Sequence, residues 1–208
     1  QLEIPLISQF QEDLEKLGLR TEEELTWALG ASEGLKYGRM CGPICIAMAG
    51  KYFKQDHEDI LSVFYETKDK NYIKTINNQD IDYHYWNAKA GWYYDGLIKK
   101  AEEAYGLQGH SGYINPQEES FMANTKDLLA QCIDNQKILI CSVYPEFFTD
   151  KRGGHLVIVR GYNWNGIQEE LFFNDPLTPI IDGIKKPRAI SLSQFLQSRN
   201  GQYIVLNK

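Results

Sequence analysis

The most informative part of the sequence for the fold is Met40-Cys-Gly-Pro-Ile-Cys-Ile-Ala-Met-Ala-Gly-Lys-Tyr-Phe53. Pro43 suits the first turn of a helix, because the N–H that proline lacks would have no intrahelical partner there. The apolar residues that follow recur at helical spacing and on nearly every side, which is typical of a buried helix. We therefore expect a central helix in this stretch, with Cys41 at or near its N-terminus.

Further helices are expected on both sides of the central one. An acidic amphipathic stretch, Phe10 to Leu17, precedes Thr21-Glu22-Glu23-Glu24, which has the form of a capping box. The helix that this box opens should end near Gly30, where a C-cap glycine is expected. Hydrophobic periodicity and cap residues predict three more helices: His57–Glu66, Tyr94–Tyr105 closed by Gly106, and Asn124–Asn135 capped by Asn124 or Thr125.

After residue 135 the pattern changes to that of strands. Short runs rich in Val, Ile and Phe, broken by Pro, Gly and Asn, predict strands at Ile138–Tyr144, His155–Gly161 and Leu171–Asn174. Asp182-Gly183 indicates a tight hairpin turn, and a short helix at Leu192–Gln197 should precede a closing strand at Tyr203–Leu206. Helices first and strands later predict an α+β fold, with N-terminal helices packed on a C-terminal antiparallel sheet. With no repeat or linker, residues 1–208 are expected to form one domain.

Composition narrows the classes of function. The 208 residues carry a net charge of -6 and include no extended cluster of Lys and Arg, so nucleic-acid binding is not expected. No apolar run is long enough to span a membrane, and no signal peptide is visible in the sequence from Gln1. The compartment stays open between a secreted or cell-envelope location and a cytoplasmic one. The cysteine and histidine spacings match no zinc motif, and no metal is expected.

Cys41 is the strongest candidate for chemistry. At a helix N-terminus the macrodipole and free N–H groups favour the thiolate, which is the nucleophilic form of cysteine. Gly42 would leave room for a substrate carbonyl, and the Cys41 N–H would point at a developing oxyanion. The alternative is that Cys41 is a buried core residue, as we expect for the other three cysteines: Cys45, Cys132 and Cys141.

His155 and Asp175 supply the other groups that a thiol nucleophile needs. His155 begins an apolar strand after two glycines, which places its imidazole at a sheet edge where a helix N-terminus can lie. An antiparallel return strand ending in Phe172-Phe-Asn-Asp-Pro176 would bring Asp175 beside His155, where a carboxylate fixes the tautomer of the ring. Asn174 is the less favoured alternative for this role. Each residue also has a purely structural interpretation, a capped strand end for His155 and a turn for Asn-Asp-Pro.

Together these three blocks resemble a known family. Met-Cys-Gly-Pro with its apolar helix, Gly-Gly-His-Leu-Val-Ile-Val-Arg-Gly-Tyr-Asn, and Phe-Phe-Asn-Asp-Pro are similar to the Cys, His and Asp blocks of the bacteriocin-processing cysteine peptidases, and more closely to their looser bacterial peptidase-like relatives. The resemblance covers most of residues 1–208, including Gly96–Leu107 and Asp127–Tyr144. It implies a papain-like fold and a bacterial origin.

The resemblance also implies a mechanism. Cys41, His155 and Asp175 would act as nucleophile, base and orienting carboxylate on a peptide or protein substrate, through a thioester and without a cofactor. The family's oxyanion glutamine usually lies shortly before the cysteine, but residues 35–40 hold no Gln or Asn. Ile4-Pro-Leu-Ile-Ser-Gln9 is similar to the family's Pro-x-x-x-Gln segment, so that role passes to Gln9, and residues 10–36 become a helical insertion.

Two other functions are compatible with the same residues. A non-catalytic peptide- or glycan-binding domain could retain the fold, and the aromatic residues between Tyr83 and Tyr94 could then line its cleft. Burial of these aromatic residues against the sheet is the simpler interpretation. A transglutaminase-like acyl transferase would use the same three catalytic groups. His57, His84 and His110 have no partner pattern and are expected to be surface or cap residues.

Overall fold

The structure is a computed structural model that describes residues 1–7, 11–29, 39–55, 57–87, 91–144, 154–164, 167, 169–177, 180–181, 184–185 and 188–208. Its helices are α1 (Gln11–Lys16), α2 (Glu22–Leu29), α3 (Cys41–Tyr52), α4 (Ile60–Thr67), α5 (Tyr94–Tyr105), α6 (Phe121–Asp134) and α7 (Leu192–Ser198). Its strands are β1 (Asn71–Ile76), β2 (Gln79–His84), β3 (Trp86–Asn87), β4 (Gly91–Trp92), β5 (Gln108–Tyr113), β6 (Ile138–Val143), β7 (His155–Asn163), β8 (Glu170–Asn174), β9 (Ile180–Ile181), β10 (Ile184–Lys185), β11 (Arg188–Ser191) and β12 (Arg199–Asn207).

The C-terminal half forms a six-stranded antiparallel sheet in the order β11-β8-β7-β6-β12-β5. Every residue of β6 is buried, as are the first five residues of β7, so the centre of the sheet is covered on both faces. This explains why these two strands read as continuous apolar runs rather than as alternating ones. The predicted α+β fold, with helices first and an antiparallel sheet after them, is confirmed.

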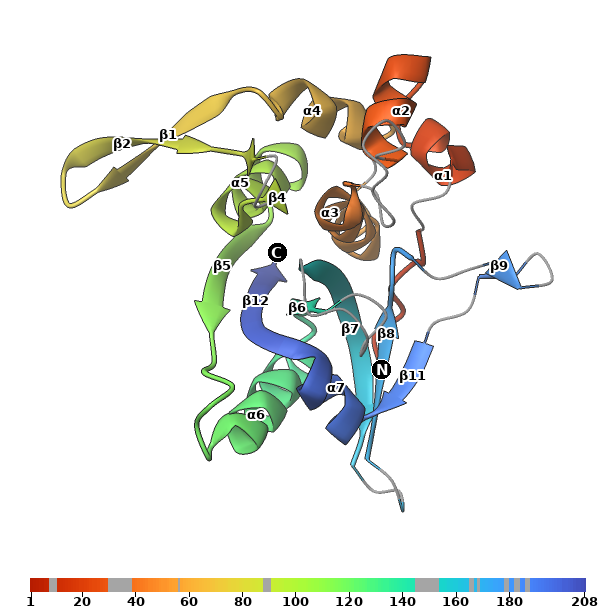
Figure 1. Ribbon diagram of the computed structural model, residues 1–208, viewed down its shortest axis with the longest axis vertical. Coiled ribbons are helices and arrows are strands. Elements are labelled where there is room, and N and C mark those ends of the chain that lie inside the picture. Colours follow the sequence, from red (N-terminus) through yellow and green to blue (C-terminus); the bar gives the residue numbers. More distant parts are fainter. Residues whose placement is uncertain are drawn as a thin grey trace.

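Helix α3 lies at the centre of the molecule, between the sheet and the helices α1, α2 and α4 (Figure 1). Its residues from Gly42 to Gly50 are all buried, as the apolar pattern on every side predicted. Gly50 permits a close contact, because a Cβ there would lie 2.4 Å from the Tyr105 ring of α5. Burial on all sides fixes the position of α3, and with it the position of the residue that begins the helix.

Several predicted boundaries and caps can be compared with the structure. The capping box is present, since Glu24 N donates to Thr21 Oγ1 at 3.2 Å and Thr21 N donates to Glu24 Oε2 at 2.8 Å. Gly106 closes α5 in the left-handed conformation, with φ at 63°. The predicted start at His57 is wrong, because α4 begins at Ile60. Gly30 and the Asp182-Gly183 turn lie outside the described residues, although β9 and β10 pair on either side of that turn.

The prediction for α6 is also wrong at its N-terminus. The helix begins at Phe121 after Ser120, so neither Asn124 nor Thr125 is the cap. Thr125 instead lies within the helix, fully buried, and its hydroxyl accepts a hydrogen bond from Arg199. A side chain committed to a distant arginine is unavailable for the local capping that its residue type favours.

The N-terminal segment runs beside the sheet. Leu2 N donates to Arg160 O on β7, and the buried Asn174 side chain donates to the carbonyls of Ile4 and Pro5, at 2.9 and 3.1 Å. These bonds hold the first residues of the chain against the end of β8. Among the described residues, no helix is long and apolar enough to cross a membrane.

Candidate active site

Cys41 is the first residue of α3, and its N-cap residue is Met40. As a whole residue Cys41 is partly exposed, whereas the other three cysteines are buried. Gly42 lies against two leucines, since a Cβ at this position would come within 2.9 Å of Leu97 and 3.4 Å of Leu156. The helix therefore presents its first thiol at a surface, and the glycine lets that helix end approach the start of β7.

His155 is the first residue of β7 and pairs with Val143, the last residue of β6. It is 2% exposed, and its Nε2 lies 2.6 Å from Asp175 Oδ1. Because a carboxylate only accepts hydrogen bonds, Nε2 carries the hydrogen and Nδ1 is the ring nitrogen left for another partner.

Asp175 follows the last residue of β8 and is 1% exposed. Besides His155, it accepts a hydrogen bond from Leu177 N at 2.8 Å and one from Arg188 Nη1 at 2.7 Å. Burial alone would raise the pKa of this carboxyl group, but the hydrogen bond and charge of His155, with those from Leu177 and Arg188, lower it below its usual value. Asp175 is therefore a carboxylate that is held on three sides.

Cys41 and His155 also interact with each other. Burial would raise the pKa of the Cys41 thiol, but the hydrogen bond and charge of His155, together with the N–H groups of Leu156 and Gly42, lower it. Burial would likewise lower the pKa of His155, yet its bonds to Asp175 and Cys41 raise it to about 9. Both shifts favour a thiolate beside an imidazolium, which is the reactive form of a thiol nucleophile.

The other three thiols have the opposite electrostatics. Burial raises the pKa of Cys45 well above its usual value, raises that of Cys132 to about 11, and raises that of Cys141. The Cys45 S–H group donates to Leu156 O at 3.4 Å, one helical turn beyond Cys41 in α3. Only Cys41 among the four therefore has an environment that favours its thiolate.

Two further sequence candidates have different outcomes. Asn174, the alternative to Asp175, points to the N-terminal segment and donates to Ile4 O and Pro5 O rather than to His155. Gln9 lies outside the described residues. The role of Gln9 therefore stays a prediction from the family pattern.

Arg188 was missed by the sequence analysis. It begins β11 and pairs in register with Phe173, which places its guanidinium beside Asp175. The contact could not be predicted from the sequence, because Arg188 lies thirteen positions after Asp175 in a segment without a strong strand pattern. Within the described part of the chain, no group of three or more His, Cys, Asp and Glu residues could hold a metal ion.

Comparison with known proteins shows the family of this chain. The sequence model described as the peptidase C39-like family matches residues 1–202. The chain belongs to that family. Among proteins with curated descriptions, none matches the sequence.

Two solved structures are similar to this C39-like chain. A structure described as a C39-like peptidase from Bacillus anthracis superposes with a TM-score of 0.56 at 15% identity, covering 99% of this chain and 95% of the other. The peptidase domain of Streptococcus ComA, a bifunctional ABC transporter of a quorum-sensing pathway, gives a TM-score of 0.48 at 19% identity, over 81% of this chain and 90% of that domain. The predicted family resemblance and papain-like fold are confirmed, and they support a cysteine peptidase type of function.

The aromatic segment that was considered as a cleft lining is largely packed instead. Tyr85 and Trp92 are buried, and the Trp92 Nε1–H group donates to Arg39 O at 2.7 Å. Trp27 of α2 packs edge-on against both Trp86 and Trp92. Packing therefore accounts for most of the aromatic residues described in this segment, whereas His84 and Tyr93 are exposed.

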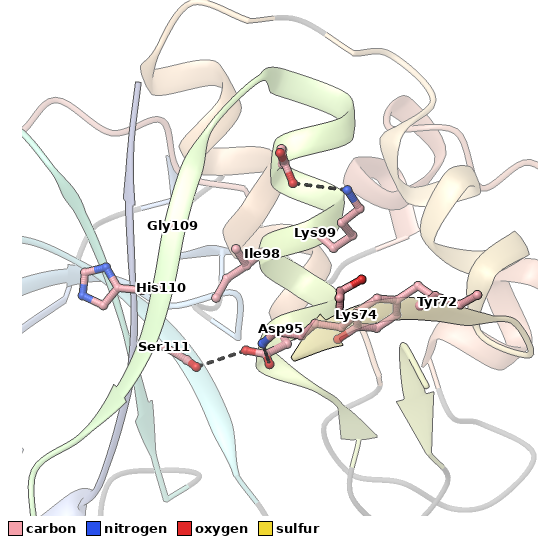
Figure 2. A pocket seen from close by; sticks show the side chains of 11 residues that line it. Tyr72, Lys74, Asp95, Ile98, Lys99, Gly109, His110 and Ser111 are labelled. Atoms are coloured by element: carbon pink, nitrogen blue, oxygen red, sulfur yellow. Dashed lines mark hydrogen bonds and ion pairs between the residues drawn. The ribbon is translucent and has the colours of Figure 1, made fainter. Parts of the chain in front are cut away.

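A separate hollow of about 520 Å³ lies between β1, α5 and β5, and Cys41, His155 and Asp175 do not line it. Figure 2 shows Asp95 at its centre, where its carboxylate pairs with Lys74 Nζ at 2.5 Å and accepts from Ser111 Oγ at 3.2 Å. His110 points to the other side of β5, so it contributes no imidazole to this hollow. The polar groups at its centre are bonded to one another, and the hollow shows no arrangement for chemistry.

Proposed function

We propose that this protein is a cysteine peptidase in which Cys41 is the nucleophile, His155 the base and Asp175 the residue that orients the base. The proposal rests on the buried pair of His155 and Asp175 and on its effect on the ionisation of Cys41. Although burial alone would lower the pKa of the imidazole, Asp175 and Cys41 together raise it to about 9, and the imidazole in turn lowers the pKa of Cys41. A structural cysteine has no need of such a partner.

In the proposed reaction the Cys41 thiolate attacks the carbonyl carbon of the scissile amide, forming a carbon–sulfur bond and an oxyanion. The Cys41 N–H and, as inferred from the family pattern, the Gln9 amide stabilise this oxyanion. His155 donates its Nδ1 proton to the leaving nitrogen as the carbon–nitrogen bond breaks. The neutral ring then takes a proton from water, hydroxide attacks the thioester, and the carboxylic acid leaves with the thiolate restored.

Replacing Cys41 with alanine tests this function. We expect hydrolysis of a library of internally quenched fluorogenic peptides to fall by at least about 10³-fold, because the step that forms the acyl-enzyme is lost. Cys45→Ala, in the same helix, is the matched control and should retain activity, since that thiol is buried and protonated.

Two outcomes would contradict the proposed function. If the wild-type protein cleaves no peptide and no peptide fluoromethyl ketone modifies Cys41, the chain is a binding domain. If added amines are incorporated instead of water, it is an acyl transferase.

Gln9 has a separable effect. Gln9→Ala is expected to lower kcat by about 10²-fold, the usual cost of losing one oxyanion donor. Alkylation of Cys41 by iodoacetamide should keep its wild-type rate, because that reaction forms no oxyanion. Gln131→Ala, an exposed glutamine on α6, is the control for both measurements. Equal kcat values for the Gln9 variant and the wild type would show that backbone donors alone form the oxyanion hole.

A further inference from the structure

A second hollow, of about 550 Å³, lies at the end of the sheet where β6 stops and β12 begins. Residues that line it include Tyr144, which follows β6, Met122 at the start of α6, and Arg199 and Asn200 at the start of β12. No group of the proposed catalytic site lines it. Unlike the hollow between β1 and α5, it is lined by a buried arginine, Arg199, two of whose donor groups have no hydrogen-bond partner among the described residues.

Arg199 is 2% exposed, and its Nη1 donates to Thr125 Oγ1 at 2.9 Å. Its Nε and Nη2 groups are also buried, and among the described residues neither has a hydrogen-bond partner. The guanidinium lies near three aromatic rings, with its Cζ between 5.8 and 6.0 Å from their centroids, those of Phe121, Phe195 and Tyr203. Rings of this kind offset part of the cost of a buried charge but accept no conventional hydrogen bond.

The start of α6 contributes to the same hollow. The first two residues of this 14-residue helix, Phe121 and Met122, line it. Among the described residues, α6 has no side-chain N-cap bond, and its first turn contains no acidic residue. The N–H groups at a helix start favour an anion. A buried cation with two free donor groups and an uncapped helix start therefore favour the same kind of ligand.

The hollow opens at the end of the sheet that carries the catalytic histidine. Arg199 pairs with Val143, and Val143 pairs with His155, so the three residues form one row across β12, β6 and β7. Two strand spacings separate the backbones of Arg199 and His155 by about 10 Å, a distance that about three residues of an extended peptide cover. Beside this row Asn200 Nδ2 donates to Ser142 Oγ at 2.7 Å, and Ser142 pairs across the sheet with Leu156, the residue after His155.

We propose that this hollow is a substrate subsite that binds a carboxylate of the peptide, with Arg199 as its specificity-determining residue. The proposal rests on the peptidase function argued above. The carboxylate belongs to an acidic side chain or to the C-terminus of a substrate, within about three residues of the scissile bond. Arg199 lines the hollow, but its Nε and Nη2 groups are buried, so binding requires a side chain of the lining to move. Met122 lines the same hollow and is suited to such a movement, because its side chain is 51% exposed and unbranched.

Binding can be measured without catalysis. The Cys41→Ala protein, labelled with ¹⁵N, is titrated with N-acetylglutamate α-amide, with N-acetylglutamine α-amide as the neutral isostere, and with N-acetylglutamine as a free acid. We expect a saturable downfield shift of the Arg199 Nε–H signal with a carboxylate ligand and none with the neutral one. The first compound reports a side-chain carboxylate and the third a terminal one. Equal responses to all three compounds, or a carboxylate response that spares Arg199, would overturn the proposal.

Hydrolysis supplies the second measurement. In a peptide library with Glu or Gln fixed at each position, plus C-terminal acid and amide pairs, the preferred carboxylate should raise kcat/KM by about 10- to 100-fold over its neutral partner. Arg199→Met should reduce that ratio to near one, while its melting temperature stays at or above that of the wild type, because a poorly paired buried charge has been removed. If the methionine variant does not fold, Arg199→Lys tests the role of Arg199 in carboxylate binding. This variant keeps the charge and should retain part of the preference for the carboxylate substrate.

The outcomes separate the two proposals. Carboxylate binding at Arg199 without hydrolysis of any peptide would refute the peptidase function and leave an anion site. Hydrolysis with equal rates for Glu and Gln peptides, and for acids and amides, would refute the subsite and leave the peptidase. Arg20→Met, which removes an exposed arginine, is the control and should leave the ratio unchanged.

Discussion

Replacing His155 with alanine is expected to slow the alkylation of Cys41 by iodoacetamide at pH 6 by up to roughly 300-fold. Only about 0.3% of an ordinary thiol with a pKa of about 8.5 is ionised at that pH, and the thiolate is the reacting form. His155 lowers the pKa of Cys41, whereas burial alone would raise it. Without the imidazole the thiol therefore loses the largest of the interactions that together outweigh its burial, and peptide hydrolysis should fall by about 10³-fold or more.

The rate of Cys41 alkylation should depend on pH differently in the two proteins. In the wild-type protein, labelling should begin at the lowered pKa of Cys41, and the imidazolium should persist until the pH approaches 9, the raised pKa of His155. Between these two values the thiolate and imidazolium form an ion pair. In the His155→Ala protein, labelling should rise only above about pH 8.5, the range of a free thiol.

The protein contains its own controls for this experiment. Mass-spectrometric mapping of alkylated peptides over time reports all four cysteines at once, and the buried thiols at 45, 132 and 141 should react slowly at pH 6 in both proteins. His84→Ala removes an exposed histidine on β2 and should leave the labelling of Cys41 unchanged. Equal rates for Cys41 in the wild-type and His155→Ala proteins would refute the ion pair.

Much of the fold could be predicted from local pattern, because the elements around the site satisfy local and tertiary preferences together. Helix α3 is apolar on all sides and buried on all sides, and β7 is a continuous apolar run at the centre of a sheet. In both elements the pattern leaves a single placement, in the core. The relation between Cys41 and His155 followed from placing a helix start against a strand start.

Strands with polar surfaces could not be predicted in the same way. β1 and β2 are mostly exposed and form a hairpin that projects from the molecule (Figure 1), so they lack the alternation of a half-buried strand. Their turn did leave a signal, since Asn77 and Asn78 both have positive φ angles, 51° and 61°, which asparagine tolerates and two-residue hairpins require. β5 is also mostly exposed and polar, and only its pairing with β12 makes it a strand.

The partners within the site depend on tertiary contacts. Arg188 reaches Asp175 because β11 pairs with β8, and Arg199 reaches Thr125 because β12 begins beside α6. Neither arginine has a sequence neighbour that indicates its partner. Sequence pattern thus predicted a cysteine at a helix start and a histidine at a strand start, and it missed the two arginines, whose partners belong to other elements.

Asp175→Asn should reduce kcat/KM by about 10²- to 10⁴-fold, because the amide is neutral and no longer stabilises the imidazolium or fixes its tautomer. The side-chain volume is unchanged, and Arg188, whose side chain is 38% exposed, can be solvated after losing its ion pair. Labelling of Cys41 should slow less than in the His155→Ala protein, since the imidazole remains. Asp134→Asn, which keeps an acceptor for the Tyr162 hydroxyl on the surface, is the matched control and should have little effect.

The melting temperatures of the wild-type and Asp175→Asn proteins, measured against pH, test the electrostatic part of this prediction. The folded protein lowers the pKa of Asp175, so its carboxylate contributes stability that is present above its unfolded pKa of about 3.9 and is lost as the pH falls through the lower, folded value. The wild type should therefore be the more stable protein at neutral pH, and the difference should shrink in acid. A variant with wild-type kcat/KM would show that His155 is oriented without Asp175. A stability difference that is unaffected by pH would show that the loss comes from packing rather than from the charge of the carboxylate.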